Sequence, residues 1–156
     1  MIRILVISDT HGHNAFVEKE ISSIGEENIH AIIHAGDCVE DAEMLSYTYP
    51  NIPMYNVAGN NDMFSTADDD KLITLGGVKI FITHGHGYRV KYDSDFETLL
   101  RKAQAVGADI AVFGHTHSTH LSYHGKLILL NPGSAGYSDR YAVIEIEDGK
   151  AKAKLM

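Results

Sequence analysis

Short apolar segments of strand type recur along the sequence, and several of them are followed closely by Asp, His or Asn. Residues 2–8 (IRILVIS) lead to Asp9, and residues 108–114 (ADIAVFG) lead to His115. Continuous apolar runs rich in β-branched residues are typical of strands that are buried on both faces. Ligand sites of α/β sheets lie beyond the carboxyl ends of such strands. The pattern therefore predicts an α/β fold with a polar site at one edge of its sheets.

The order of the predicted elements differs between the two halves of the chain. Up to residue 59, strands alternate with helices, as in parallel sheets. Later segments favour antiparallel hairpins, with turns at Gly76-Gly77 and Asp148-Gly149. We therefore expect helices outside two sheets that pack face to face. The predicted strand regions are 2–8, 30–36, 52–59, 71–85 (a hairpin), 108–114, 120–125, 126–134 and 140–155 (a hairpin).

The predicted helices rest on apolar residues at helical spacing and on start signals. Asn14 is a residue type that caps helices, and Ser94 with Glu97 forms a capping-box pattern. The apolar residues are Val17, Ile21 and Ile24 in the first helix, Met44 and Leu45 in the second, and Leu99, Leu100, Ala103 and Val106 in the third.

Length and composition restrict the class of protein. The 156 residues predict one domain, residues 1–156, with a substantial core. The single Cys38 excludes an internal disulfide framework, and we expect it to be a small buried residue. No apolar run is long enough to cross a bilayer and no secretory signal is recognisable, so we expect a cytoplasmic protein without a membrane partner.

The charge of the chain restricts its partners. A formal net charge of −8, without a basic stripe, argues against long nucleic acids, because these are held by Lys and Arg on phosphates. A small anionic substrate is still allowed, since bound metal ions would reverse the local field. A homo-oligomer is compatible with the sequence, although no patch points to one. The run Asp68–Asp70 is expected to be a solvated loop.

The residues that follow the strands are metal-ligand types without any thiolate. Histidine supplies nitrogen, aspartate an anionic oxygen and asparagine a carbonyl oxygen. A catalytic zinc takes about three protein ligands, so the set is too large for one tetrahedral ion. It fits two ions about 3.5–4 Å apart that share a carboxylate. Each residue taken alone could be a hydrogen-bonded histidine at a strand end or a turn residue. The recurrence of these residue types after successive strands favours metal binding. The candidates are Asp9, His11, Asp37, Asn60, His84, His115 and His117.

Five of these strand-end segments, in order, resemble the motifs of the calcineurin-like metallophosphoesterases. The short chain and the sequence NPGS at 131–134 are similar to the small prokaryotic phosphodiesterase branch of that superfamily, and the resemblance runs from residue 4 to about residue 146. It implies a four-layer α/β/β/α sandwich of two mixed sheets flanked by helices. The motifs are Asp9-Thr10-His11, Gly36-Asp37, Gly59-Asn60-Asn61-Asp62, Thr83-His84-Gly85-His86 and Gly114-His115-Thr116-His117.

The resemblance also implies a role for each ligand. Asp9, His11 and His117 would bind the first ion, Asn60, His84 and His115 the second, and Asp37 both. Manganese is the expected metal, and nickel, iron and zinc accept the same ligands. Our hypothesis is that a water shared by the two ions becomes hydroxide. This hydroxide attacks a small phosphodiester in line, without a covalent enzyme intermediate. Asp37 and Asn60 thereby belong to the catalytic centre.

The chain departs from many relatives at Asn61, where they have a histidine that could protonate the leaving group. An amide cannot act as a general acid, so good leaving groups are favoured, or protonation by His86 or water. We interpret His86 as a substrate-contacting residue or acid, with support of a ligand as the alternative, and Asn61 as substrate-binding. Asp62 would orient His84 from outside the ligand set, or serve only as a turn residue. Asn131 to Ser134 are expected to shape the rim of the cavity.

Other classes of protein fit less well. A metallo-β-lactamase-type site needs His-x-His-x-Asp-His, and a nucleotide-binding loop needs Gly-x4-Gly-Lys-Ser/Thr; the sequence has neither. The serious alternative is a non-catalytic protein-interaction scaffold, because a retromer subunit has this fold with a degraded metal site. All the ligand positions are filled here, which favours an enzyme. His13, His30, His34, His120 and His124 lack motif support and are expected to be structural or solvent-facing.

Overall fold

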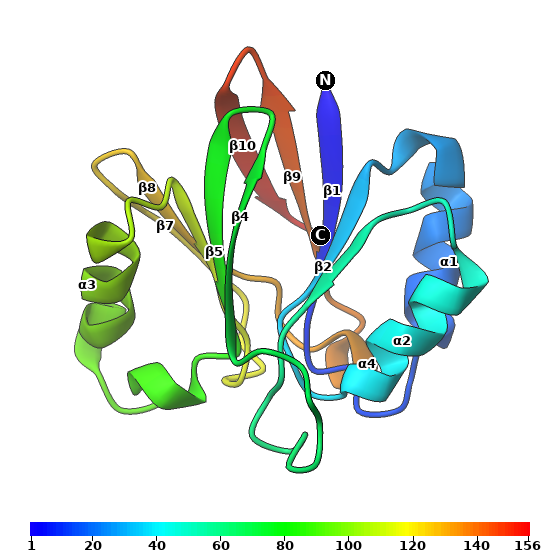
Figure 1. The fold of residues 1–156 in the computed structure, drawn as a ribbon, viewed down its shortest axis with the longest axis horizontal. Coiled ribbons are helices and arrows are strands. Elements are labelled where there is room, and N and C mark those ends of the chain that lie inside the picture. The colour runs from blue at the N-terminus through cyan, green and yellow to red at the C-terminus, as the bar shows by residue number, and fades with distance from the viewer.

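The computed structural model describes residues 1–156 and contains two five-stranded sheets packed face to face (Figure 1). The first sheet has the spatial order β10 (Lys150–Leu155), β9 (Ala142–Glu147), β1 (Ile2–Ile7), β2 (Ala31–His34) and β3 (Met54–Asn56). The second has the order β4 (Asp70–Leu75), β5 (Val78–Thr83), β6 (Ile110–Val112), β8 (Leu127–Asn131) and β7 (His120–His124). The helices are α1 (Ala15–Ile24), α2 (Val39–Thr48), α3 (Glu97–Ala105) and α4 (Ala135–Ser138), with 3-10 turns at Glu26–Asn28, His86–Tyr88 and Ser94–Phe96.

Strand β1 explains why the sequence runs apolar without alternation. Ile4 and Val6 join the core between the two sheets, whereas Leu5 and Ile7 pack on the other face with residues of α1 and α2. From Ile4 to Ile7 both faces of the strand are therefore covered, and this stretch is apolar throughout. Figure 1 shows α1, α2 and α4 on the outer side of this sheet.

The second sheet is covered in the same way by α3. Leu99 and Ala103 of this helix pack with Phe81 of β5 and Ala111 of β6 on the outer face. The helices thus enclose two mixed sheets in four layers (Figure 1), which confirms the predicted α/β/β/α sandwich.

The parallel strands determine where the polar loops lie. β1, β2 and β3 are parallel to one another in the first sheet, and β5, β6 and β8 in the second. The loops that follow these strands gather at one edge of the sandwich, at the bottom of Figure 1. This edge holds the residues that the sequence singled out.

The strand β3 and the helix α4 depart from the prediction. β3 is shorter than the predicted 52–59, because the backbone N–H of Ala58 turns away to donate to the carbonyl of Asp68 (2.8 Å). The helix α4 was not predicted, since four residues are too few to show a period. Its start is marked by Ser134, whose hydroxyl accepts the N–H of Tyr137 (3.0 Å).

The predicted capping box of the third helix is wrong. Asp95 and Phe96 adopt left-handed backbone angles, so the helix α3 begins at Glu97 rather than after Ser94. The carboxylate of Asp93 accepts the N–H of Thr98 (3.0 Å) in place of the serine hydroxyl. Both Asp and Ser are capping types, and the local backbone decides which of them serves.

The acidic run is a solvated loop only in part. Asp68 and Asp69 are exposed, but Asp70 begins β4 and accepts a hydrogen bond from the hydroxyl of Tyr88 (2.5 Å). None of the helices combines the length and the apolar character that crossing a lipid bilayer requires.

Candidate metal centre

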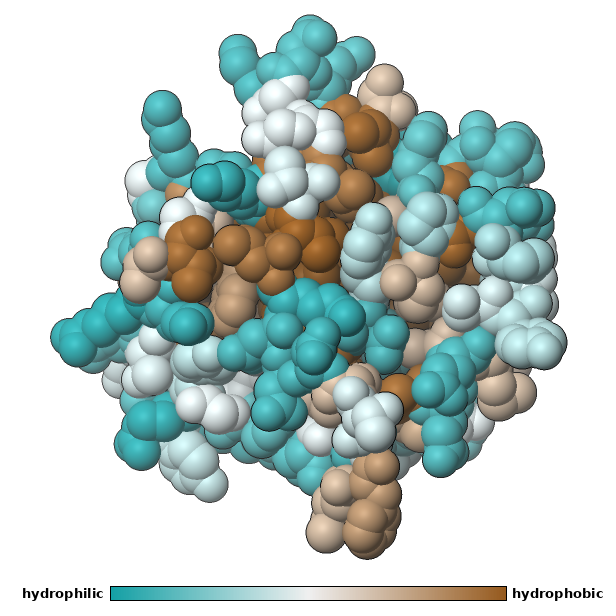
Figure 2. Space-filling model, in the orientation of Figure 1, coloured by the Kyte–Doolittle hydropathy of each residue, from teal (hydrophilic) through white to brown (hydrophobic).

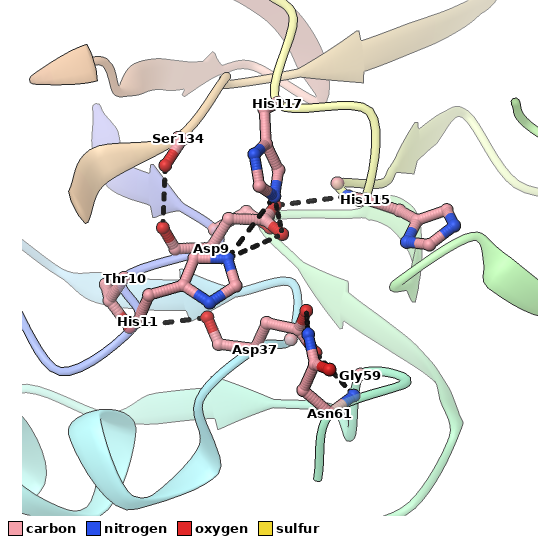
Figure 3. Close-up of polar contacts among 12 residues, drawn as sticks. Asp9, Thr10, His11, Asp37, Gly59, Asn61, His115, His117 and Ser134 are labelled. Atoms are coloured by element: carbon pink, nitrogen blue, oxygen red, sulfur yellow. Dashed lines mark hydrogen bonds and ion pairs between the residues drawn. The ribbon is translucent and has the colours of Figure 1, made fainter. Parts of the chain in front are cut away.

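The candidate ligands come from both sheets. Asp9 and His11 follow β1, Asp37 follows β2 and Asn60 follows β3, whereas His84 follows β5 and the pair His115 and His117 follows β6. Figure 3 shows Asp9 and His11, from the loop after β1, converging with His117, from the loop after β6. The centre therefore lies across the edge where the two sheets meet.

Asp9, His11 and His117 form a compact group. Oδ1 of Asp9 lies 3.2 Å from Nε2 of His117 and 3.6 Å from Nε2 of His11, and the two imidazole nitrogens are 3.3 Å apart (Figure 3). Two nitrogens about 2.0–2.1 Å from one tetrahedral ion would stand about 3.4 Å apart. The three donors are thus spaced as corners of one coordination sphere.

Asp9 carries an oxygen that no hydrogen bond satisfies. The residue is fully buried, and its Oδ2 accepts the hydroxyl of Ser8 (2.5 Å) and the N–H of His115 (3.1 Å). Its Oδ1 has no hydrogen-bond partner. A buried unpaired carboxylate oxygen is costly, so native structures retain one where an ion or a proton binds. The donor set fits a divalent cation at this position.

His84 is the centre of a second group. Its Nε2 lies 3.0 Å from Oδ1 of Asn60, 3.5 Å from Oδ2 of Asp37 and 3.8 Å from Oδ1 of Asp9. Its Nδ1 donates to the carbonyl of Ala35 (2.7 Å). In the neutral ring this bond fixes the proton on Nδ1 and leaves the lone pair of Nε2 free for a cation.

The carboxylate of Asp37 is held by Asn61. The amide Nδ2 of Asn61 donates to Oδ2 (2.7 Å) and its backbone N–H to Oδ1 (3.1 Å). Burial by itself would raise the pKa of Asp37, but the contact with His84 and the Asn61 hydrogen bonds outweigh it and keep this pKa well below its usual range. The carboxylate is therefore ionised, and each oxygen keeps a lone pair for a cation.

The pKa of His84 changes in the opposite direction. Burial by itself would lower this pKa, yet the carboxylates of Asp37 and Asp9 raise it above its ordinary value. Asp9 belongs to two groups of close donors: Asp9, His11 and His117 form one, and Asp9, Asp37 and His84 form the other.

His115 lies outside both groups. Its backbone N–H binds Asp9, but its imidazole points away from Asp9 (Figure 3). The ring centroid lies 5.1 Å from that of His84 and 6.1 Å from that of His86. The structure thus brings six of the seven predicted ligands together and leaves the ring of His115 beside them.

Two aromatic residues border the groups. His86 is exposed, with its ring centroid 5.6 Å from that of His84. Tyr137 of α4 stacks on His11, with centroids 4.7 Å apart and planes 19° apart. Sequence reasoning missed Tyr137, because its position depends on a helix too short to be predicted.

Asp62 does not contact His84, so the expected orienting role is wrong. The carbonyl of Ala35 holds that ring instead. Asp62 accepts three backbone N–H groups, from Gly59 (2.7 Å), Val39 (2.9 Å) and Asp37 (3.1 Å). It therefore ties the loop that carries Asp37 to the loop that carries Asn60.

Asn131 to Ser134 do not shape the rim, because all four residues are buried beneath it. Nδ2 of Asn131 donates to the carbonyl of Gly114 (3.1 Å), and the hydroxyl of Ser134 donates to the carbonyl of Asp9 (2.8 Å). The segment fixes two ligand loops from below. The NPGS sequence signalled its importance but not this role.

The ligand loops are tightly constrained. The backbone φ angle is positive at Asp9, His11, Asp37, His115 and His117, a conformation that is uncommon outside glycine. Two motif glycines leave no room for a side chain: an added Cβ would lie 1.9 Å from Oδ1 of Asp37 at Gly59, and 2.0 Å from Oγ of Ser8 at Gly114. Such strain persists where surrounding contacts enforce it, and it concentrates at functional sites.

Residues without motif support mostly match expectation. His34 is fully buried: its Nδ1 accepts the N–H of Gly36, and its Nε2 binds the hydroxyl of Thr10 (2.9 Å). His13 and His30 are exposed, and His120 and His124 flank the hydroxyl of Ser122 on β7. Cys38 is half-buried rather than buried, because it lines a surface cavity beside α2.

A four-layer sandwich with Asp, His and Asn gathered at the carboxyl ends of its strands is the architecture of a metallophosphoesterase. Residues 2–149 match the model of the calcineurin-like phosphoesterase superfamily domain, and the chain belongs to this family. The resemblance inferred from the five motifs is confirmed.

Relatives of known sequence cover nearly the whole chain. A probable metallophosphoesterase of Bacillus subtilis, YsnB, is 31% identical over 99% of this chain and 90% of its own. A phosphodiesterase of Methanocaldococcus jannaschii is 28% identical over 97% of this chain and 95% of its own. Hydrolysis of phosphoric esters is therefore the chemistry of the family.

Solved structures agree with the fold. A predicted phosphoesterase of Streptococcus pneumoniae is similar with a TM-score of 0.75 and 27% identity, over 99% of this chain and 98% of its own. Vps29 of Entamoeba histolytica in complex with Zn²⁺ is similar with a TM-score of 0.76 and 24% identity, over 99% of this chain and 98% of its own. At that identity the likeness to Vps29 concerns the fold alone.

Proposed function

We propose that residues 1–156 act as a single metallophosphoesterase domain that hydrolyses small phosphodiesters with two divalent cations. The observation that carries this proposal is the buried Oδ1 of Asp9, which has no hydrogen-bond partner and faces the imidazole nitrogens of His11, His84 and His117. One carboxylate oxygen opposite three such donors is suited to divalent cations and costly without them.

The proposed ligand sets are those that the five sequence motifs imply. Asp9, His11 and His117 hold the first cation, and Asn60, His84 and His115 the second, with Asp37 binding both. The ring of His115 must turn toward His84 to join its set, a short movement for a half-exposed side chain. Manganese is the expected metal, and nickel, iron or zinc suit the same nitrogen and oxygen donors.

The reaction adds water across a P–O ester bond. When bound, the cations acidify a water molecule at neutral pH and offset the negative charge of the phosphoryl oxygens. Oxygen of the water bonds to phosphorus, the ester bond breaks, and the departing alcohol takes up a proton. His86, exposed beside His84, supplies that proton or contacts the substrate. Asn61 cannot supply it, because its amide holds Asp37 and does not ionise.

The test is an activity matrix of metals against substrates on protein stripped with a chelator. We expect bis(p-nitrophenyl) phosphate to be hydrolysed only after a divalent cation is restored, and best with manganese. Asp37→Ala should abolish turnover and reduce the bound metal, whereas Asp68→Ala, at an exposed carboxylate, should do neither. Full activity of Asp37→Ala with its metals retained would refute the ligand assignment.

The second candidate is a non-catalytic protein-interaction scaffold of the same fold. The observation in its favour is the structural likeness to Vps29. The two groups of close aspartate and histidine donors favour the enzyme. Metal-dependent hydrolysis of a chromogenic diester separates the two, because a scaffold would show none with any metal.

The charge of the chain bears on the size of its substrate. We propose small substrates rather than long nucleic acids, since the net charge of −8 offers no basic track for a phosphate backbone. We also propose a cytoplasmic enzyme. Its self-association, which the sequence leaves open, is measured directly by sedimentation.

A further inference from the structure

A surface cavity of about 490 Å³ opens beside the metal centre, between the start of α2 and the loop that follows β3. Asn61 lines this cavity and also donates two hydrogen bonds to Asp37. A phosphodiester with its phosphorus at the centre would therefore direct one of its two ester groups into the cavity. Pockets of this size hold small organic groups.

The lining of the cavity has one sign of charge. Glu40 and Glu43, both exposed on α2, contribute carboxylates, and no Lys, Arg or His lines it. Asp62 also lines the cavity, but its carboxylate is occupied by three backbone N–H groups. The two glutamates are thus free to meet a ligand. Their negative charge would repel a second anionic group.

The same cavity carries an aromatic ring and a thioether. Phe64 is 97% exposed and Met63 80% exposed, at the tip of the loop after β3. This loop lies at the bottom of Figure 1, where Figure 2 shows a hydrophobic projection from a largely hydrophilic surface. An aromatic face together with carboxylates attracts an organic cation, and substituted ammonium groups are bound in this manner.

We propose that the cavity lined by Glu40, Glu43 and Phe64 binds a substituted ammonium group on one ester arm of the substrate. The preferred substrate is then a zwitterionic phosphodiester of the amino-alcohol type. This inference rests on the proposed phosphodiesterase function and names its substrate class. A zwitterion has no net charge, so the net charge of −8 does not repel it as it repels an anionic diester.

The test compares two esters that differ in one atom. p-Nitrophenyl phosphocholine carries a quaternary nitrogen, and p-nitrophenyl 3,3-dimethylbutyl phosphate has carbon in its place. The leaving group is the same, so the ratio of their kcat/KM values measures only recognition of the charge. We expect the manganese-loaded protein to prefer the choline ester by about tenfold at low salt, which corresponds to a modest ionic and cation–π contact. The ratio should fall as salt is added.

Variants place the effect in the cavity. Glu40→Gln with Glu43→Gln should bring the ratio close to one, through slower hydrolysis of the choline ester, and Phe64→Ala should lower it in part. Glu26→Gln with Glu27→Gln removes the same charge from an exposed turn outside the cavity and should leave the ratio unchanged. A ratio of one or less in the unmodified protein, with both esters hydrolysed, overturns this inference and leaves the proposed function intact. If neither ester nor any other diester is hydrolysed with any metal, the proposed function itself fails.

Discussion

Oδ1 of Asp9 lies 3.2 Å from Nε2 of His117, although Asp9 follows β1 of the first sheet and His117 follows β6 of the second. The packing of the sheets therefore brings these ligands together, and in the unfolded chain they are far apart. A cation that binds both residues must bind the folded state more tightly than the unfolded state, so metal binding and folding are coupled.

The first prediction concerns stability with and without metal. A cation at a hundredfold excess over its dissociation constant should stabilise the protein by about 2.7 kcal/mol, which raises the thermal midpoint by several degrees. Asp9→Asn should lose this increase. In chelator the same variant should be at least as stable as the parent, because it removes a buried charge whose Oδ1 is unpaired.

Thermal unfolding with manganese and with chelator measures both effects. Asp68→Asn is the matched control, since Asp68 is an exposed carboxylate whose side chain pairs only with Lys71. A metal-induced increase of the same size in Asp9→Asn would show that Asp9 does not hold the ion.

The second prediction concerns Asp62, which accepts the N–H groups of Asp37, Val39 and Gly59. Asp62→Ala leaves three donors without their acceptor and should cost about 2 kcal/mol or more in the free energy of unfolding. Turnover at saturating metal should also fall, because the loop of Asp37 is no longer fixed. Asp62→Asn keeps one acceptor oxygen, so its stability and its turnover should lie between those of the parent and those of Asp62→Ala. Urea unfolding and steady-state kinetics on the parent and the two variants measure these differences. If Asp62→Ala kept the stability and turnover of the parent, the hydrogen bonds of Asp62 would be dispensable.

The fold was largely predictable because covered strands leave a plain signal. β1, β2 and β6 are buried on both faces, so their apolar runs mark them without any knowledge of their partners. Since parallel strands end at a common edge, the residues after them could be assigned to one site. Six of the seven expected ligands were brought together in this way.

What sequence could not supply was the direction of particular side chains. Whether the ring of His115 or its N–H faces Asp9 depends on a backbone φ angle of 70° and on contacts between distant loops. Asp62 and Ser134 bind backbone groups, and backbone groups carry no sequence signature. Tyr137 reaches His11 from a helix of four residues, too short for periodicity to reveal.

The third prediction concerns Gly114, whose missing side chain makes room for the Asp9 loop. A Cβ at this position would lie 2.0 Å from Oγ of Ser8 and 2.6 Å from Oδ2 of Asp9. Gly114→Ala should displace the carboxylate and greatly reduce both metal binding and turnover. Gly87→Ala is the control, because Gly87 is near the ligand His84 in sequence but a Cβ added there would meet no atom within 4 Å. Calorimetric titration with manganese compares the two; equal affinities would show that the loop absorbs the methyl group.

The fourth prediction concerns pH and His34. Burial lowers the pKa of His34 from 6.5 to about 4, in spite of the opposing charges of Asp41 and Asp62. As the pH falls below 6.5, the unfolded chain takes up this proton before the folded protein does. The stabilisation is therefore complete above pH 6.5 and is lost as the pH falls toward 4. Because one pKa unit corresponds to about 1.4 kcal/mol, the loss should approach about 3 kcal/mol.

Urea unfolding in chelator between pH 7.5 and 4.5 measures this loss. His34→Gln should be less stable at neutral pH, since the bonds to Thr10 and Gly36 are disturbed, but its stability should fall less as the pH decreases. His30→Gln, at an exposed position, should retain the pH dependence of the parent. A parent curve as flat as that of His34→Gln would mean that the buried imidazole does not titrate in this way.

The fifth prediction concerns the proton that the departing alcohol needs. Asn61 cannot supply this proton, because an amide does not ionise and both its side-chain amide and its backbone N–H are bound to Asp37. His86 is the exposed imidazole next to His84 and the remaining side chain suited to this task. A nitrophenolate leaves without taking up a proton, whereas an alkoxide needs one. A general acid that supplies the proton increases the rate by about 10²–10⁴-fold. His86→Asn should therefore lower kcat on a dialkyl phosphodiester by about a hundredfold and change kcat on bis(p-nitrophenyl) phosphate only a few-fold. Hydrolysis of the dialkyl ester is measured by phosphorus NMR. An equal small loss on both esters would remove His86 as the acid.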